Sequence, residues 1–316
     1  MDVERPPRSD FNHKPEIAVA LTPFLGFAGF QPISTIQSLL TTLPEIDSLL
    51  RPFESYRAFI DASAQAGPKE LKELVRSVLK LNHKSDSGVL KSVTDAIAVG
   101  TGMKGSDNDN LKRDGVDVDK SIEGLLARVQ QEGTAVFSQS HLTAEQSERL
   151  VLALKKMQQY YKGDPASIVA AFMMNLIELK PGEAIYVGAD GVHAWLDGRE
   201  LVECRCMKFG SLTFDSSWSL SLEIIELMAT SDNVLNLGFV PAAEKDSVDM
   251  FIDAVTCEPK SGDEYKLKKQ EWKLSEGAGA TVYKVGLGYH TKIPGLNSLP
   301  RKRSKGPDRR IFALPH

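Results

Sequence analysis

The chain of 316 residues contains only three cysteines, Cys204, Cys206 and Cys257. Three cysteines cannot build a disulfide framework, and a lone Cys-x-Cys pair lacks the ligand spacing of a zinc-binding motif. No apolar run approaches the roughly 18 residues that a membrane helix needs, and the start, MDVERPPRSD, has neither the basic start nor the apolar stretch of a signal peptide. We therefore expect reduced thiols, a cytoplasmic location and no membrane partner.

Acidic residues are scarce at the end of the chain: residues 288–316 hold seven Lys/Arg and one Asp, although the whole chain has a formal net charge of -4. The run RKRSK at 301–305 is compatible with a nuclear address, a nucleic-acid patch or a solvated basic tail. No aromatic residues are interleaved with it, so we favour the solvated tail and expect no nucleic-acid partner. The length and the 42% hydrophobic content predict two or three ordinary globular domains. We expect a monomer, although no feature of the sequence determines the oligomeric state.

The beginning of the chain has the period of a β-strand, because Ile17, Val19 and Leu21 alternate and Pro and Gly residues follow up to residue 30. The pattern then becomes helical. PKELKELVRSVLKL places apolar residues at the i, i+3, i+4, i+7, i+8 spacing of one helical face: Leu71, Leu74, Val75, Val78 and Leu79.

A second helix is indicated by its N-terminal signal. TAEQ at 143–146 matches a capping box, in which the first and fourth residues satisfy each other's backbone N–H groups. Leu150, Leu154, Met157 and Tyr161 are then expected to line one face of this helix. We predict that residues 33–173 are mainly helical.

The segment GTGMKGSDNDNLKRDGVDVD, residues 100–119, contains five Asp and raises the question of a calcium loop. Counted from Asp107, the sixth position is Lys112 instead of Gly and the twelfth is Val118 instead of Glu, which does not fit an EF-hand. We interpret the segment as a disordered acidic linker.

The strand period returns in MNLIELKPGEAIYVGADGVHAWLDG, with Leu176 to Leu179, a Pro-Gly turn and Ala184 to Val187. Short strands separated by Gly, Pro and Asp continue to about residue 285, after which the alternation is lost. This order predicts a mixed β and α fold: a barrel or sandwich built from both ends of the sequence, with the helical block inserted between them.

His193 follows a strand and a Gly-rich turn, but a lone His beside apolar residues is more often structural than functional. Four strings taken together are more specific: NHKPEIAVALTPF, GFQP, KPGEAIYVGADGVHAWLDG and IIELMATSDNVLNLGF, in this order. They resemble the type I mannose-6-phosphate isomerase (phosphomannose isomerase) family over residues 10 to about 285. The resemblance implies a zinc enzyme that interconverts the hexose phosphates mannose 6-phosphate and fructose 6-phosphate, a step in GDP-mannose metabolism.

The resemblance also implies a fold: a cupin-type β-barrel or jelly roll, an inserted α-helical domain and a second, truncated cupin-like β domain. The expected divisions are residues 1–32 for the start of the catalytic barrel and 33–173 for the helical insert. Residues 174–240 would return to the barrel, with 199–222 as an extra segment. Residues 241–316 would form the truncated β domain and a basic tail.

The same resemblance implies site residues. Glu16 and His193 would be two zinc ligands, with Trp195 in place of the family's Tyr. Lys14 would lie near the substrate phosphate, and Glu226 would be the catalytic carboxylate that moves a proton between C1 and C2.

Several departures from the family pattern are visible. Two further zinc ligands come from a Gln-x-His string before NHKPE, yet only eleven residues precede Asn12, so we expect an N-terminally clipped chain with an incomplete zinc site. No His-x-His occurs to replace them, and His13 is the nearest candidate. Asn236 stands at the family's Arg position and Ala242 at its Lys position.

The extra segment at 199–222 separates His193 from Glu226, which we expect on neighbouring strands of one barrel wall. It is either a genuine loop or a retained in-frame intron, and its apolar residues have no evident place in the barrel. The sequence leaves two functions open: a mannose-6-phosphate isomerase, or a non-catalytic sugar-phosphate-binding paralogue that has lost the metal site.

Overall fold

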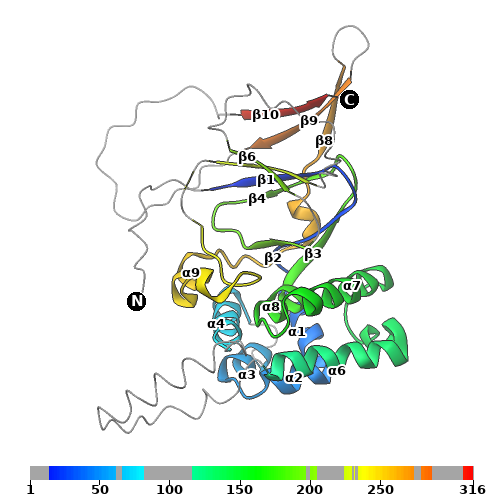
Figure 1. Ribbon diagram of the computed structural model, residues 1–316, viewed down its shortest axis with the longest axis vertical. Coiled ribbons are helices and arrows are strands. Elements are labelled where there is room, and N and C mark those ends of the chain that lie inside the picture. Colours follow the sequence, from blue (N-terminus) through cyan, green and yellow to red (C-terminus); the bar gives the residue numbers. More distant parts are fainter. Residues whose placement is uncertain are drawn as a thin grey trace, which may run out of the picture.

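The computed structural model describes residues 14–61, 66–81, 116–196, 200–204, 224–229, 231, 234–273, 279–286 and 309–315. Within these ranges the strands occupy one half of the molecule and most helices the other (Figure 1). From bottom to top in this view lie the helices, two facing β-sheets and a third sheet. His13 and the RKRSK run lie outside these ranges.

The first sheet has the strand order β4-β1-β7-β6. Its strands are β1 (Glu16–Ala20), β4 (Ala184–Val187), β6 (Glu200–Cys204) and β7 (Ile224–Met228). β1 is antiparallel to both β4 and β7, whereas β6 is parallel to β7. The predicted strand at the start of the chain is confirmed, but it ends at Ala20 and leaves Leu21 outside it, 37% exposed.

The second sheet has the order β3-β2-β5, formed by β2 (Phe24–Phe30), β3 (Met174–Leu179) and β5 (His193–Trp195), all antiparallel. The register of β2 with β3 shifts between Ala28 and Phe30. Gly29 lies at this irregularity with φ of 55°, where a Cβ atom would lie 1.5 Å from the Tyr265 hydroxyl oxygen. Only glycine fits there without rearrangement.

The two sheets face each other across a shared apolar interior. Successive side chains on a strand point to opposite faces, so every second residue enters this interior. It comprises Ala18, Ala20, Phe24, Ala28, Ile177, Leu179, Ile185, Val187, Ile224 and Tyr265, with Trp195 packed against them.

The opposite face of the first sheet carries a second small cluster around Ile17, Val19 and Ala184. A third sheet of order β10-β9-β8 lies at the top of Figure 1: β8 (Lys269–Lys273), β9 (Gly279–Gly286) and β10 (Arg309–Pro315). The sequence predicted that strand structure is lost after residue 285, and this is wrong for residues 309–315. They pair antiparallel with β9 along its length, because β9 has a free edge on the side away from β8.

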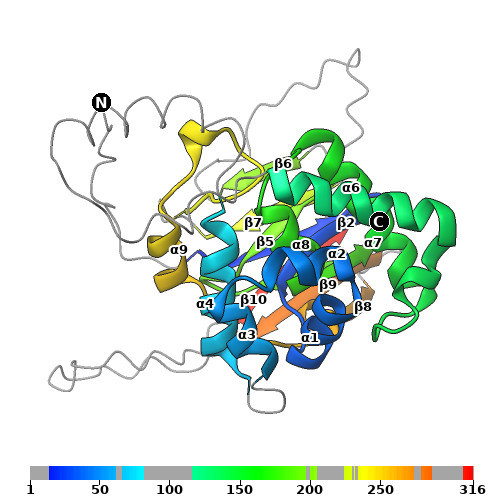
Figure 2. The ribbon, with the colours of Figure 1, turned by 90° about the horizontal axis from the view of Figure 1, so that it is seen from below.

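The helices between β2 and β3 confirm the predicted helical region within its described parts. They are α1 (Ile33–Thr42), α2 (Pro44–Leu50), α3 (Glu54–Asp61), α4 (Pro68–Leu79), α6 (Val116–Glu132), the 3-10 helix η3 (Gly133–Phe137), α7 (Ala144–Tyr160) and α8 (Ala166–Met173). They cover the outer face of the second sheet (Figure 2), where Leu25 and Phe27 of β2 join the largest apolar cluster. Among the described helices, none is both long and apolar enough to cross a membrane.

The sequence predicted the helix details well, with two exceptions. The capping box exists: Gln146 N–H donates to the Thr143 hydroxyl, and Thr143 N–H donates to the Gln146 side chain. Tyr161, however, lies beyond the end of α7 and is 38% exposed, because it packs sideways on Phe239 instead of continuing the helix face. The expected linker also ends early, since α6 already begins at Val116.

The segment after β7 returns to the helical half before the third sheet. It contains η4 (Ala242–Glu244) and α9 (Val248–Ala254) there, and then η5 (Gly262–Tyr265), which packs beside β2, β3 and β4. Buried Asp164, between α7 and α8, accepts hydrogen bonds from the Phe239 backbone N–H and from Lys245 Nζ at 2.9 and 3.1 Å. These bonds attach the segment to the helices.

Candidate metal centre

Three strands bring Glu16, His193 and Glu226 together at one end of the interior between the facing sheets. Glu16 precedes the inward-facing Ala18 by two residues on β1, and Glu226 follows the inward-facing Ile224 by two on β7. His193 enters from β5 of the opposite sheet. Their ligand atoms lie within 4.8 Å of one another.

β5 and β7 do not form the expected neighbouring strands. β5 pairs with β2, and β7 pairs with β1 and β6, so His193 and Glu226 meet across two sheets. The prediction of one barrel wall was wrong because β6, from the extra segment, occupies the free edge of β7. Facing sheets still allow inward side chains to touch.

The histidine ring has a defined tautomer. Its Nδ1 lies 3.2 Å from the Gly191 carbonyl oxygen, which can only accept, so Nδ1 carries the proton and donates. In the neutral ring the Nε2 lone pair then points toward Glu16 Oε2, 3.0 Å away. This orientation is the one that metal-binding histidines adopt.

Glu16 Oε2 is buried and, among the residues that the structure describes, has no hydrogen-bond partner of good geometry, although His193 Nε2 is close to it. Burial alone would raise the pKa of Glu16. When His193 is protonated, its hydrogen bond and charge, together with Glu226 and the charge of Lys14, outweigh burial and hold the pKa of Glu16 below its ordinary value. The site therefore favours the Glu16 carboxylate, which is balanced either by a proton on His193 Nε2 or, when the ring is neutral, by a cation held between the two groups.

The distances fit a metal ion. Ligands about 2.05 Å from a tetrahedral zinc lie about 3.3 Å apart. Nε2 of His193 is 3.0 Å from Glu16 Oε2 and 3.9 Å from Glu226 Oε1, on either side of that value. One imidazole nitrogen and two carboxylates are also suitable donors for zinc. Glu226 is only 4% exposed, whereas the His193 side chain is 26% exposed, which leaves the cluster accessible from the His193 side.

Trp195 is a site residue to which the sequence assigned no role. Its indole Nε1 donates to Glu226 Oε1 at 3.3 Å, and its ring centroid lies 5.0 Å from that of His193. The available signal was its spacing, since Trp195 lies two residues after His193 on the same strand face.

The other predicted residues are spread more widely. Lys14 is half-buried just before β1, close enough for its charge to lower the pKa of Glu16. Asn236 lies in the segment on the helical half, and its backbone N–H donates to Asp246 Oδ2 at 2.7 Å. Among the described contacts, the polar interactions of Asn236 run to Asp246 rather than to the three-residue cluster. Ala242 lies in η4.

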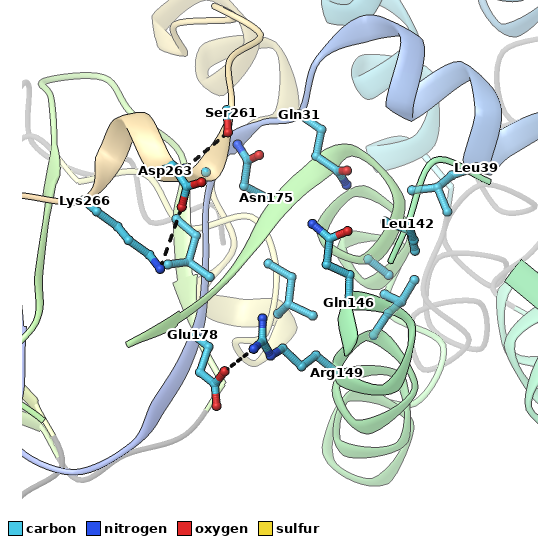
Figure 3. Close-up of a pocket in the computed structure, with 15 residues that line it drawn as sticks. Gln31, Leu39, Leu142, Gln146, Arg149, Asn175, Glu178, Ser261, Asp263 and Lys266 are labelled. Atoms are coloured by element: carbon cyan, nitrogen blue, oxygen red, sulfur yellow. Dashed lines mark hydrogen bonds and ion pairs between the residues drawn. The ribbon is translucent and has the colours of Figure 1, made fainter. Parts of the chain in front are cut away.

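A cavity of about 150 Å³ lies elsewhere, between α7, β3 and η5 (Figure 3). Its two cations are paired with carboxylates: Arg149 with Glu178 at 2.5 Å, and Lys266 with Asp263 at 3.8 Å. With its charges balanced in this way, the cavity has no charge preference for an anionic ligand, and we assign it no function.

The fold and the cluster define a class: a mixed α and β protein with a helical layer and a candidate carboxylate–imidazole metal centre between two facing sheets. No protein-family model matches the chain. Its curated relatives are named mannose-6-phosphate isomerases. That from Cryptococcus neoformans is 30% identical over 269 residues, which is 82% of this chain and 49% of the relative. That from Rattus norvegicus is 30% identical over 79% of this chain and 43% of the relative.

Mannose-6-phosphate isomerase 1 of Arabidopsis thaliana is 29% identical over 72% of this chain and 38% of its own length. The chain is therefore homologous to the mannose-6-phosphate isomerases, and the resemblance inferred from its sequence strings is confirmed. It spans about half the length, or less, of these relatives.

A solved structure supports the fold. A phosphomannose isomerase mutant from Salmonella typhimurium matches with a TM-score of 0.50 at 20% identity, covering 88% of this chain and 54% of the other. At this identity the match concerns the fold alone, a mixed arrangement of helices and small, largely antiparallel sheets.

Proposed function

We propose that this chain binds zinc through Glu16, His193 and Glu226 and catalyses the interconversion of mannose 6-phosphate and fructose 6-phosphate. The observation that carries the proposal is the convergence of three ligand residues from three strands, within 4.8 Å, in a homologue of the mannose-6-phosphate isomerases. Zinc is the metal that the sequence resemblance implies. The non-catalytic alternative is not favoured, because the curated relatives are named as isomerases.

An aldose–ketose isomerisation moves a proton between C1 and C2 and develops negative charge on the adjacent oxygens. When bound, zinc supplies a Lewis acid for that charge. Glu226 is the carboxylate to which the sequence resemblance assigns the proton transfer, and its burial keeps bulk water away; it would offer one oxygen to the metal and the other to the proton. Lys14 offers a positive charge to the phosphate group.

The proposal includes a fold and its divisions. The facing sheets form a cupin-type barrel, residues 33–173 form a domain inserted into it, and residues 241–316 belong to a second β unit. Direct pairing of β2 with β3, the strands that flank the helices, supports the insertion. The cytoplasmic, monomeric state expected from the sequence is part of the same proposal.

The test is a coupled assay of fructose 6-phosphate formed from mannose 6-phosphate by the zinc-loaded chain, with zinc content measured on the same samples. We expect turnover in the parent, and loss of turnover together with weaker zinc binding in Glu226→Gln, because the amide is a poorer ligand and cannot carry the proton. Glu148→Gln, the same exchange on the exposed face of α7, serves as the control and should behave as the parent. A parent that neither retains zinc nor converts mannose 6-phosphate would instead support the non-catalytic alternative, which has lost the metal site, and a parent that retains zinc without turnover would overturn the proposed activity.

A further inference from the structure

We propose that Trp195 is a positioning residue of the metal site: it fixes the orientation of the Glu226 carboxylate and limits the movement of the His193 ring. The inference rests on the proposed zinc-binding function. It concerns a residue at which this chain departs from the Tyr that its resemblance implies.

Two contacts support this role. The indole N–H donates to Glu226 Oε1 at 3.3 Å, and this same oxygen lies 3.9 Å from His193 Nε2. The indole ring lies beside the imidazole, with centroids 5.0 Å apart at an interplanar angle of 38°. One side chain thus contacts two of the three proposed ligands.

The indole is itself held in place. Trp195 pairs directly with Gly26 across β2 and β5, and a Cβ atom at Gly26 would lie 2.6 Å from Trp195 Cε3. The ring of Phe24 meets the indole edge to face at 5.6 Å. The missing side chain at Gly26 therefore creates the space that the larger ring of Trp195 occupies.

A fixed hydrogen bond to a ligating carboxylate restricts its rotation and reduces the freedom lost when the metal binds. Partners of this kind typically change metal affinity by about 10- to 100-fold when they are removed. Trp195→Phe removes the N–H and keeps an aromatic ring against His193. Gly26→Ala keeps the N–H but forces the indole away from its present position.

Tyr56→Phe is a matched control, because Tyr56 Oη donates to a carboxylate oxygen, Asp47 Oδ1, at 2.6 Å in the helical half. It removes an aromatic donor to a carboxylate without touching the metal site.

The experiment is a competition titration of zinc against a chromophoric chelator, with the visible absorption of a bound cobalt ion as a second readout. Circular dichroism verifies folding. We expect Trp195→Phe and Gly26→Ala each to bind zinc about 10- to 100-fold more weakly, with an altered cobalt spectrum, and Tyr56→Phe to match the parent.

Parent-like affinity and spectrum in Trp195→Phe would overturn the inference while leaving the proposed function intact. If Trp195→Phe does not fold, Gly26→Ala decides by the same criterion. A parent that binds no zinc would overturn the proposed function itself, and with it this role of Trp195.

Discussion

Zinc should stabilise the folded chain, because the three proposed ligands come together only in the folded state. Glu16, His193 and Glu226 come from three strands far apart in the sequence, so the unfolded chain cannot assemble them. Binding is then confined to the folded state. At a free zinc concentration of about 100 times the dissociation constant, the free energy of unfolding rises by about 2.7 kcal/mol. For a domain of 150 to 250 residues this corresponds to a rise in Tm of roughly 5 to 10 °C.

Replacing Glu16 by Gln should remove most of this stabilisation. The amide keeps the shape of the side chain but loses the buried anionic oxygen that faces His193 Nε2 at 3.0 Å. If affinity falls about 100-fold, the same zinc concentration stabilises the variant by only about 0.4 kcal/mol, or roughly 1 °C in Tm.

The assay is a thermal melt by circular dichroism of chelator-stripped protein, with and without zinc. Glu148→Gln should show the full shift of the parent. The reasoning is refuted if zinc leaves the Tm of the parent unchanged, or if Glu16→Gln shifts as far as the parent does, since the metal would then bind elsewhere.

Three further changes test the surrounding structure. Gly29→Ala, which places a Cβ atom on the Tyr265 hydroxyl at a φ of 55°, should lower the free energy of unfolding by about 2 to 4 kcal/mol in a urea melt; a parent-like melt would contradict this. Cys257 is buried and burial raises its pKa to about 12, so peptide-resolved labelling at neutral pH should find it unreactive until the chain unfolds. Burial raises the pKa of Glu45, but hydrogen bonds from Arg128 at 2.8 and 2.9 Å outweigh burial and hold this pKa below its ordinary value of 4.5. The Glu45–Arg128 pair therefore stabilises the fold above pH 4.5, and this stabilisation is lost as the pH falls through the lowered pKa of Glu45. Arg128→Met should lower the free energy of unfolding by about 1 to 2 kcal/mol at pH 7 and by less in acid. An equal loss at both pH values would contradict this prediction.

The periodicity of apolar residues predicted the helices and strands, because the face of each element that packs in the core must be apolar. Leu71, Leu74, Val75 and Val78 are fully buried on α4, as their spacing indicated. The prediction that Tyr161 lies on the face of α7 was wrong, because the helix ends at Tyr160 and the ring of Tyr161 packs sideways on Phe239 of a distant segment. Such contacts depend on the fold and leave no periodic signal.

The candidate site was predictable in composition but not in arrangement. Sequence strings singled out Glu16, His193 and Glu226, and the structure brings them within ligand distance, while their individual roles remain predictions. Their position across two facing sheets, and the contact of Trp195 with Glu226, depend on which strands pair. Strand pairing is a long-range property that alternation within one strand does not encode.

The extra segment now has a structural role that its composition did not suggest. Residues Glu200–Cys204 form β6, which pairs in parallel with β7 along its whole length, and Val202 lies opposite Glu226. A parallel connection needs about a dozen residues or more, and the stretch from 205 to 223 is long enough. β6 therefore protects the edge of the strand that carries a proposed site residue.

Deleting residues 199–222 should consequently destabilise the protein and weaken zinc binding. The deletion removes every backbone hydrogen bond between β6 and β7, each contributing about 1 kcal/mol net, so we expect a loss of a few kcal/mol in paired urea melts. A control variant keeps β6 and replaces residues 205–222 by a Gly/Ser linker of equal length, which should retain most of the stability. If the deleted chain is as stable as the parent and binds zinc equally well, β6 contributes nothing to the sheet and the segment is dispensable. If the linker variant unfolds like the deletion, the stabilising contacts belong to residues 205–222 instead of to the strand.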